Sequence, residues 1–325
     1  MKLTYLINQA LDTTKFLLSY WTGSSCCPHP PMILMIEPTN HCNIKCTMCF
    51  RDALTRGKGF LSRELYERLL DKNRRIKRII FVGSGETLLH PDLEMLIKYA
   101  AERNIVTTLV TNGTLLDEER ARRLISSGIN GITISLDATS KAEYEKLRRG
   151  ADYDKVENNI RNFVKLRNKF YRKKLAISVN CVDFDYPSPK KECLRKNILS
   201  LGVDFVNFPP FHNGPIINKR MDFTANKKEY CGCILPWLML TVLWDGRVAA
   251  CCDDFDGKNI VGHLKEDILI DNLWNSRAIC ELRGKLAKND IKDLICSGCH
   301  RIHKNPWKYL FFDRMCREIK EIFAP

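Results

Sequence analysis

The sequence lacks any continuous apolar run of about 18 residues, the length that a membrane-spanning helix requires. It also lacks an N-terminal apolar stretch followed by a small-residue cleavage site, so we expect a cytoplasmic protein. Acidic residues are scarce relative to basic ones: 38 Asp and Glu against 52 Lys and Arg give a net charge of +14. Stacking aromatics are not interleaved with the basic residues, which argues against a nucleic-acid-binding surface.

The basic residues are densest between positions 141 and 174. Solvated helix faces would account for such a run without any function. The functional alternatives are an anionic substrate or an acidic electron-carrier protein that is attracted by the positive charge.

Cysteine is used heavily, yet its density does not match a disulfide scaffold. The chain has 15 cysteines in 325 residues, too few per residue for a small disulfide-bonded domain and many for a reduced enzyme without a use for them. The composition is otherwise that of a globular protein, with 45% hydrophobic and 28% charged residues. Cysteine usage therefore predicts metal binding.

Apolar runs rich in β-branched residues alternate with amphipathic helical patterns in the first two thirds of the chain. Nearly continuous apolar strands separated by helices are typical of a parallel sheet covered by helices. We therefore predict an α/β domain over residues 32–210. Its expected strands lie within residues 32–37, 78–83, 106–113, 131–137, 175–182 and 203–210, and helices are expected at 62–74, 90–104, 117–128 and 188–202.

Three cysteines, Cys42, Cys46 and Cys49, lie in the loop after the first predicted strand. This is the end of a parallel sheet at which ligands collect. A structural zinc site requires four protein ligands, and His41 cannot easily reach the ion that Cys42 would bind. An iron-sulfur cluster held by three thiolates would instead leave one iron open to a non-protein ligand.

The stretch CNIKCTMC resembles the C-x3-C-x2-C signature of the radical S-adenosylmethionine (radical SAM) enzymes, and EPTNH precedes it as in members with cysteine-rich C-terminal extensions. The resemblance implies a partial (βα)6 TIM-like barrel and a 4Fe-4S cluster whose open iron is chelated by S-adenosylmethionine. It also implies reductive cleavage of this cosubstrate to a 5'-deoxyadenosyl radical, which abstracts a hydrogen atom from a substrate C–H bond.

The same resemblance implies roles for polar residues that follow the next strands. GSGE at positions 83–86 resembles the motif that holds the methionine ammonium, and Met48 stands where the family often has an aromatic residue near the adenine. Taken singly, several of these residues could equally cap strand ends or form turns. The implied cofactor-binding residues are Met48, Gly83, Gly85, Glu86, Thr111, Asn112, Ser135, Asp137 and, by position only, Asn180. No catalytic acid or base is assigned.

A second cysteine pattern follows residue 231. An apolar stretch with the turn dipeptide Asp245-Gly246 predicts a β-hairpin, and a helical stretch separates it from CSGC. By spacing alone, four thiolates there suit either zinc or an iron-sulfur cluster. The layout resembles the SPASM/twitch extensions of radical SAM enzymes, which implies one auxiliary 4Fe-4S cluster. The expected ligands are Cys233, Cys251, Cys296 and Cys299, and Cys231 or Cys252 is the alternative to one of them.

The predicted domain organisation has five parts. They are an N-terminal amphipathic helix and linker (1–31), the barrel (32–210), a linker (211–230), the SPASM/twitch-like module (231–304) with its hairpin and helix, and a C-terminal amphipathic helix (305–325). The apolar stripe expected on the first helix contains Leu3, Leu6, Ile7, Ala10, Leu11, Leu17, Leu18 and Trp21. We favour packing on the main domain over contact of residues 1–22 with a membrane surface, because a cationic face is missing.

Three functions follow, and they differ in substrate. The favoured one is radical SAM chemistry on a small polar or anionic metabolite such as a sugar, aminocyclitol or nucleotide. The first alternative is a peptide or protein maturase of the same chemistry, and the second is a non-catalytic zinc or iron-sulfur protein. The excess of positive charge also predicts a flavodoxin or ferredoxin as electron donor.

Overall fold

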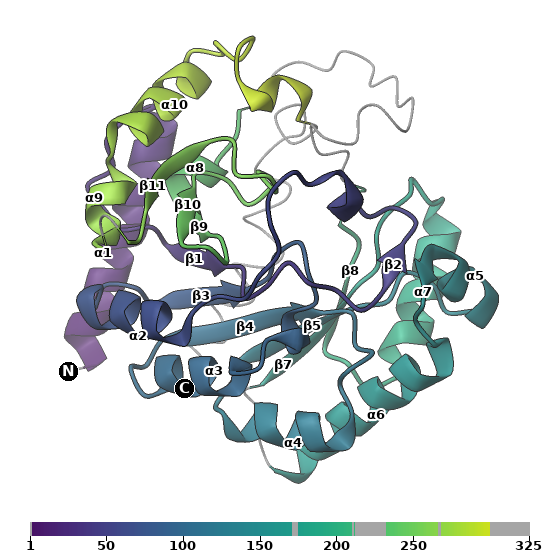
Figure 1. Cartoon of the computed structure of the whole chain (residues 1–325). Coiled ribbons are helices and arrows are strands. Elements are labelled where there is room, and N and C mark those ends of the chain that lie inside the picture. Colours follow the sequence, from purple (N-terminus) through teal and green to yellow (C-terminus); the bar gives the residue numbers. More distant parts are fainter. Residues whose placement is uncertain (1, 171–174, 210, 212–231, 266–267, 300–325) are drawn as a thin grey trace.

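The computed structural model describes residues 2–170, 175–209, 211, 232–265 and 268–299 (Figure 1). The predicted C-terminal helix at 305–325 lies outside these residues, as do Cys231 and the predicted linker at 211–230 apart from Phe211.

One sheet of nine strands forms the centre of the described structure, in the order β11-β10-β9-β1-β3-β4-β5-β7-β8. The strands from β1 to β8 in this order pair in parallel, each with its neighbour. The predicted α/β class is therefore confirmed, and each of the six predicted runs contains one of these strands: β1 (Ile33–Ile36), β3 (Arg78–Phe81), β4 (Val106–Thr111), β5 (Gly131–Ser135), β7 (Ala176–Asn180) and β8 (Phe205–Asn207).

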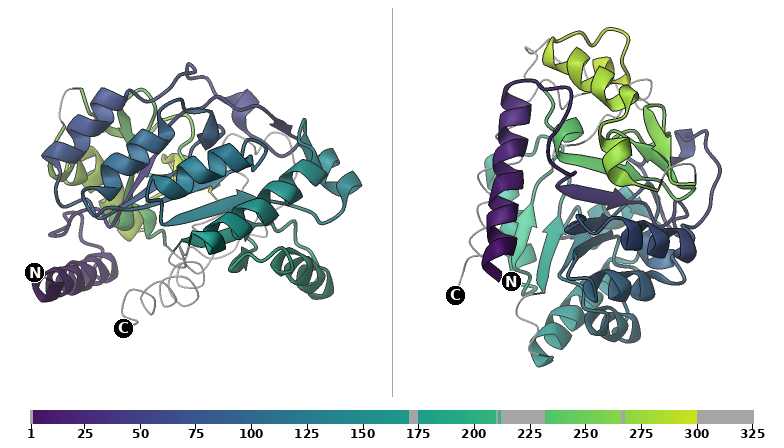
Figure 2. Two further views of the ribbon diagram at one scale, coloured as in Figure 1. Left: turned by 90° about the horizontal axis from the view of Figure 1, so that it is seen from below. Right: turned by 90° about the vertical axis from the view of Figure 1, so that its left-hand side faces the viewer.

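Helices connect these strands and form an arc along one side of the sheet (Figures 1 and 2). Local capping decides where three of them begin: Ser62, Asp117 and Asp152 each accept a hydrogen bond from a backbone N–H three residues later. The helices are α2 (Arg63–Lys72), α3 (Leu93–Ala101), α4 (Glu118–Ser126), α5 (Lys141–Leu147), α6 (Tyr153–Lys169) and α7 (Ser188–Leu199), with short 3-10 turns at Arg51–Ala53 and Thr87–Leu89.

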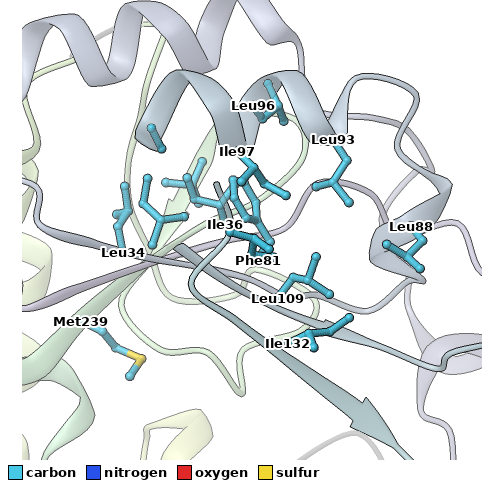
Figure 3. Close-up of a cluster of buried hydrophobic side chains, with 14 of the residues drawn as sticks. Leu34, Ile36, Phe81, Leu88, Leu93, Leu96, Ile97, Leu109, Ile132 and Met239 are labelled. Atoms are coloured by element: carbon cyan, nitrogen blue, oxygen red, sulfur yellow. The ribbon is translucent and has the colours of Figure 1, made fainter. Parts of the chain in front are cut away.

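The two faces of the sheet differ in burial. In β1, β3 and β4 the side chains alternate between fully buried and half-buried, because successive residues point to opposite faces. On the fully buried face, Phe81 and Leu109 pack beneath Leu93 and Ile97 of α3 (Figure 3). On the opposite face, the side chains of these three strands are only half-buried within the described residues.

The C-terminal segment continues the same sheet. Strand β9 (Met239–Val242) pairs in parallel with β1, and β10 (Arg247–Ala249) and β11 (Ile260–His263) extend the sheet antiparallel. The predicted hairpin is present, with Gly246 at a φ of 91° in its turn. Its first apolar run begins with a helical turn, because Pro236 stands at the start of α8 (Leu235–Leu238). Helices α9 (Ile270–Trp274) and α10 (Arg277–Ala287) and a 3-10 turn (Ile295–Gly298) follow.

Helix α1 (Lys2–Trp21) forms where the amphipathic pattern predicts a helix, but the packed side differs from the predicted stripe. Phe16 and Ser19 are buried, and Tyr20 makes an edge contact with Trp237. The stripe was right only in part: Leu17 packs against the core, but apolar residues occur on both sides of this helix, so the periodicity does not select one of them. Of the predicted stripe, Ile7, Leu11, Leu18 and Trp21 are at least half exposed.

Within the described ranges, no helix combines the length and the apolar character that a bilayer-crossing segment needs.

We predict that Phe81→Ala lowers the free energy of unfolding by about 3–5 kcal/mol, because it leaves a cavity between β3 and α3. Leu199→Ala on α7 is the control, since Leu199 is 41% exposed and its truncation should cost about 1 kcal/mol or less. Urea denaturation of both variants gives the comparison. Equal losses would show that the face under α3 is not the main core.

Candidate functional site

Cys42, Cys46 and Cys49 lie half-buried in the long loop after β1. The loop is held in shape by local bonds: Cys46 belongs to β2 (Lys45–Cys46), which pairs with β6 (Arg148–Arg149), and the Cys49 N–H donates to the Cys46 carbonyl at 3.1 Å. Each sulfur accepts from a neighbouring donor: Cys42 from Asn112 at 4.0 Å, Cys46 from Arg148 at 3.9 Å and Cys49 from the Arg51 N–H at 3.4 Å. The three sulfurs therefore face groups that stabilise negative charge.

Burial raises the pKa of the Cys46 thiol to about 11 and also raises the pKa of Cys49, and the neighbouring thiols of this loop add to both effects. The Arg148 guanidinium acts against burial at Cys46. Burial disfavours the thiolate forms, and a bound metal would supply the positive charge that stabilises them, so the three cysteines suit a metal centre.

The number of ligands distinguishes the two kinds of metal centre. A structural zinc site requires four protein ligands, whereas an iron-sulfur cluster held by the three thiolates of Cys42, Cys46 and Cys49 leaves one iron open to a non-protein ligand.

Glu86 joins the end of β3 to the end of β4 and to the cysteine loop. Its carboxylate accepts hydrogen bonds from the Thr111 hydroxyl at 2.5 Å, the Asn112 N–H at 2.7 Å and the Leu88 N–H at 3.0 Å. Burial raises the pKa of Glu86, and the bonds from Thr111 and Asn112 act in the opposite direction. The Glu86 carboxylate thus connects the end of β3 to the end of β4.

Gly83 and Gly85 allow backbone segments to approach closely. A Cβ atom at Gly83 would lie 2.3 Å from Cγ of Glu37, and one at Gly85 would lie 2.3 Å from the carbonyl oxygen of His41. Side chains are therefore excluded at both positions by the segment that leads into the cysteine loop.

Asn112 belongs to an amide network beside Cys42 that includes Asn43. Nδ2 of Asn112 donates to Oδ1 of Asn43 at 3.0 Å, and Oδ1 of Asn112 accepts from the N–H and hydroxyl of Thr114. Sequence reasoning missed Asn43, although its place between the first two cysteines is a usable signal.

Asp137 lies fully buried after β5 and pairs with Arg148 through Nε and Nη2, both at 2.7 Å. Its other oxygen accepts from the Val182 N–H. Arg148 was missed because it belongs to the basic run KLRRG, which resembles a solvated helix end. Ser135 and Asn180 are paired in register across β5 and β7, and Oδ1 of Asn180 accepts from Asn207 at 3.1 Å. Met48 is half-buried in the cysteine loop.

The four predicted ligands of the C-terminal module come from three segments. Cys233 precedes α8, Cys251 follows β10, and Cys296 lies within a 3-10 turn (Ile295–Gly298) that ends at Cys299, whose N–H donates to the Cys296 carbonyl at 2.9 Å. Among the residues that the structure describes, no three of these sulfurs lie within 4.8 Å of one another.

Cys252 and Asp253 lie next to Cys251, and the ligand atoms of these three residues do lie within 4.8 Å of one another. Cys252 therefore remains a candidate to replace one of the four ligands.

The two cysteine regions contact each other directly. The ring of Phe50, next to Cys49, stacks on Phe255 with centroids 3.6 Å apart. The N–H and hydroxyl of Thr55 donate to the Asp256 carboxylate at 2.8 and 2.7 Å, and Nε of Arg56 donates to the Phe255 carbonyl at 2.6 Å. The loop between β10 and β11 thus holds the loop that contains Cys42, Cys46 and Cys49.

Comparison with known families identifies both halves of this arrangement. The profile of the radical SAM superfamily matches residues 36–184, and that of the SPASM iron-sulfur cluster-binding domain matches residues 231–300. The chain belongs to the radical SAM superfamily. The radical SAM domain is followed by a SPASM domain, and these two domains imply a 4Fe-4S cluster with S-adenosylmethionine and an auxiliary iron-sulfur cluster.

Curated relatives match part of this radical SAM chain. A tungsten-containing aldehyde ferredoxin oxidoreductase cofactor-modifying protein of Pyrococcus furiosus is 28% identical over 174 residues, which are 53% of this chain and 49% of that protein. A PqqA peptide cyclase of Granulibacter bethesdensis is 31% identical over 120 residues, 36% of this chain and 32% of that protein. The matched regions thus span about half or less of these two relatives.

Solved structures show that the fold is the TIM-barrel-like fold of radical SAM enzymes. BtrN in complex with AdoMet and 2-DOIA aligns with a TM-score of 0.57 at 19% identity, over 84% of this chain and 95% of that chain. SuiB of Streptococcus suis, bound to the precursor peptide SuiA, aligns with a TM-score of 0.59 at 16% identity, over 83% of this chain and 70% of that chain.

We predict that Gly85→Ala in this radical SAM domain reduces iron binding at Cys42, Cys46 and Cys49, because the added Cβ would displace the backbone at His41. Gly284→Ala on α10 is the matched control, since nothing lies within 4 Å of the Cβ position there. Iron analysis after anaerobic reconstitution of both variants is the measurement. Unchanged iron in Gly85→Ala would show that the loop tolerates the shift.

We also predict that replacing Cys42, Cys46 and Cys49 together by Ala leaves about four of about eight irons per chain, as all-cysteine 4Fe-4S ligation requires for one remaining auxiliary cluster. The complementary variant, with Cys296 and Cys299 replaced, should keep the other cluster. Iron, sulfide and zinc analysis tests both. One tightly bound zinc without iron in the triple variant would contradict the auxiliary 4Fe-4S assignment.

Proposed function

We propose that the protein modifies a peptide or protein by radical SAM chemistry. The observation that supports this is the similarity of its core to proteins named PqqA peptide cyclase and mycofactocin maturase, at 27–32% identity over 120–133 residues. The sequence alone favoured a small polar or anionic metabolite, and the comparisons give more support to the peptide alternative. The non-catalytic alternative has less support, because the homologues are enzymes.

The roles of the chain's own residues follow from their positions. Cys42, Cys46 and Cys49 would hold the cluster, and the residues at the ends of β3, β4, β5 and β7 would hold S-adenosylmethionine. The bound cofactor supplies a 5'-deoxyadenosyl radical that removes a hydrogen atom from the substrate. The polar groups of Asn43 and Asn112, beside Cys42, would orient ligands at the open face of the sheet.

A small anionic metabolite is the second candidate. A probable GTP 3',8-cyclase of Methanococcus maripaludis is 25% identical over 175 residues, 53% of this chain and 58% of that protein, which is a longer match than those to the peptide-modifying proteins. The net charge of +14 would favour such a substrate. The same charge supports an acidic flavodoxin or ferredoxin as electron donor.

We predict that Cys46→Ala abolishes formation of 5'-deoxyadenosine under dithionite, because one thiolate ligand of the cluster is lost. Cys193→Ala, at an exposed cysteine of α7, is the control and should keep wild-type turnover. Anaerobic chromatography of the products measures both. Wild-type amounts of 5'-deoxyadenosine from Cys46→Ala would contradict the assignment of the site.

The substrate class can be tested with a deuterated extract of the source cells. Hydrogen abstraction transfers deuterium into 5'-deoxyadenosine, so mass spectrometry reports the substrate without its identity being known. Protease treatment of the extract should remove the deuterium signal if the substrate is a peptide. Retention of the signal after proteolysis, or a product formed from GTP alone, would instead support the metabolite.

A further inference from the structure

Three cysteines outside both cluster sites meet where the segment after α1 crosses the C-terminal domain. Cys26 is exposed, Cys27 is buried, and Cys280 is half-buried on α10, which lies near the C-terminal end of α1 (Figures 1 and 2). The sulfurs of Cys26 and Cys280 are 3.5 Å apart, although 254 residues separate them. The radical SAM chemistry derived above does not use these thiols.

The segment that carries Cys26 and Cys27 is fixed in place by polar bonds. The Cys27 N–H donates to Oδ1 of Asn275 at 2.9 Å, and Nδ2 of Asn275 donates back to the Cys27 carbonyl at 3.0 Å. The indole N–H of Trp237 donates to the Ser24 carbonyl at 2.7 Å. These bonds fix the backbone before and after Cys26, and they therefore hold its sulfur near the sulfur of Cys280.

Arg283, one helical turn after Cys280, is completely buried beside these thiols. Its guanidinium stacks on Trp274 at 4.2 Å and donates to the carbonyls of Pro236 and Ser25 at 2.9 and 3.0 Å. Nη1 also donates to Oδ1 of Asn275 at 3.3 Å, and the groups of the described residues that act on the pKa of Arg283 include no carboxylate. The groups around it that can carry negative charge are the thiols of Cys26, Cys27 and Cys280.

A buried cation without a carboxylate is costly, and a thiolate would offset part of that cost. Arg283 acts on the pKa of Cys27 and of Cys280 in the lowering direction, against the larger effect of burial. A cation that stabilises thiolates stabilises the reduced form, so a disulfide formed beside it is easily reduced. Such a pair would be redox-active and not a permanent cross-link.

We propose that Cys26 and Cys280 form a reversible disulfide that ties the segment before β1 to helix α10, and that Arg283 is the positioning residue that sets its reduction potential. Exposed Cys26 attacks an external low-molecular-weight disulfide and releases one thiol. Cys280 then attacks the mixed disulfide at Cys26 and releases the second thiol. Two protein thiols are oxidised, the external disulfide is reduced to two thiols, and the two protons of the protein thiols pass to the thiolates that are released.

The test uses the reconstituted holoprotein in anaerobic glutathione buffers of increasing oxidised fraction. After quenching by alkylation and digestion, mass spectrometry should find a peptide cross-linked between Cys26 and Cys280. Cys193, an exposed cysteine on α7, is the internal control and should form only the mixed disulfide with glutathione. In Cys280→Ser, Cys26 should also stop at the mixed disulfide.

The proposal is overturned if wild-type protein yields only glutathione on Cys26, as Cys280→Ser should, or if Cys26 pairs with Cys27. Cys26 and Cys280 remaining free in buffers that modify Cys193 would overturn it as well. The cross-link is read from the wild-type chain, so this result does not depend on whether any variant folds.

The role of Arg283 has a matched control on the same helix. Arg277 also lies three residues from Cys280, but it is 92% exposed and pairs with Glu281. We expect Arg283→Met to form the disulfide at a glutathione ratio about tenfold less oxidising, which is about 30 mV for a two-electron couple. Arg277→Met and the charge-conserving Arg283→Lys should stay near wild type. An unchanged midpoint in Arg283→Met, with wild-type iron content, would refute the role of Arg283.

Discussion

The buried ion pair between Glu37 and Arg56 is the interaction on which the cofactor region depends. Both carboxylate oxygens of Glu37 accept from Arg56 at 2.6 Å, and they also accept from the N–H groups of Ser84 and Trp244. A buried pair is stable only when its remaining donors and acceptors are satisfied, and here they are shared among four segments. β1, the turn after β3, the cysteine loop and the C-terminal domain are therefore fixed by one carboxylate.

This constraint explains why the two cysteine regions behave as one structural unit. Besides pairing with Glu37, Arg56 donates a hydrogen bond to the Phe255 carbonyl. On the same loop, the Thr55 hydroxyl donates to the Asp256 carboxylate. β9 adds to the edge of β1, so the C-terminal domain also shares the sheet that positions Cys42. A movement of the β10–β11 loop would therefore also move the cysteine loop, because hydrogen bonds from Thr55 and Arg56 connect the two loops.

The sequence predicted those features that local patterns encode. The parallel strands follow from apolar runs, and the cysteine loop follows from its spacing. Arg56, Arg148 and Asp256 were not predicted, because each is a single charged residue whose partner lies 11 to 201 residues away. The pairing of β9 with β1 was also missed, because the two strands lie far apart in the sequence and no local pattern links them. The packed side of α1 was predicted only in part, because apolar residues occur on more than one side of that helix.

The cysteines of this chain lie in different settings. The sulfurs of Cys42, Cys46 and Cys49 face hydrogen-bond donors in the loop after β1. The sulfurs of Cys26 and Cys280 lie 3.5 Å apart, although 254 residues separate them in the sequence. Because cysteine can serve either as a metal ligand or as a redox-active thiol, composition alone could indicate metal binding but could not tell which cysteines have which role. The difference follows from the backbone that holds each thiol: a loop at the strand ends carries the three predicted ligands, and helix α10 places Cys280 beside Cys26.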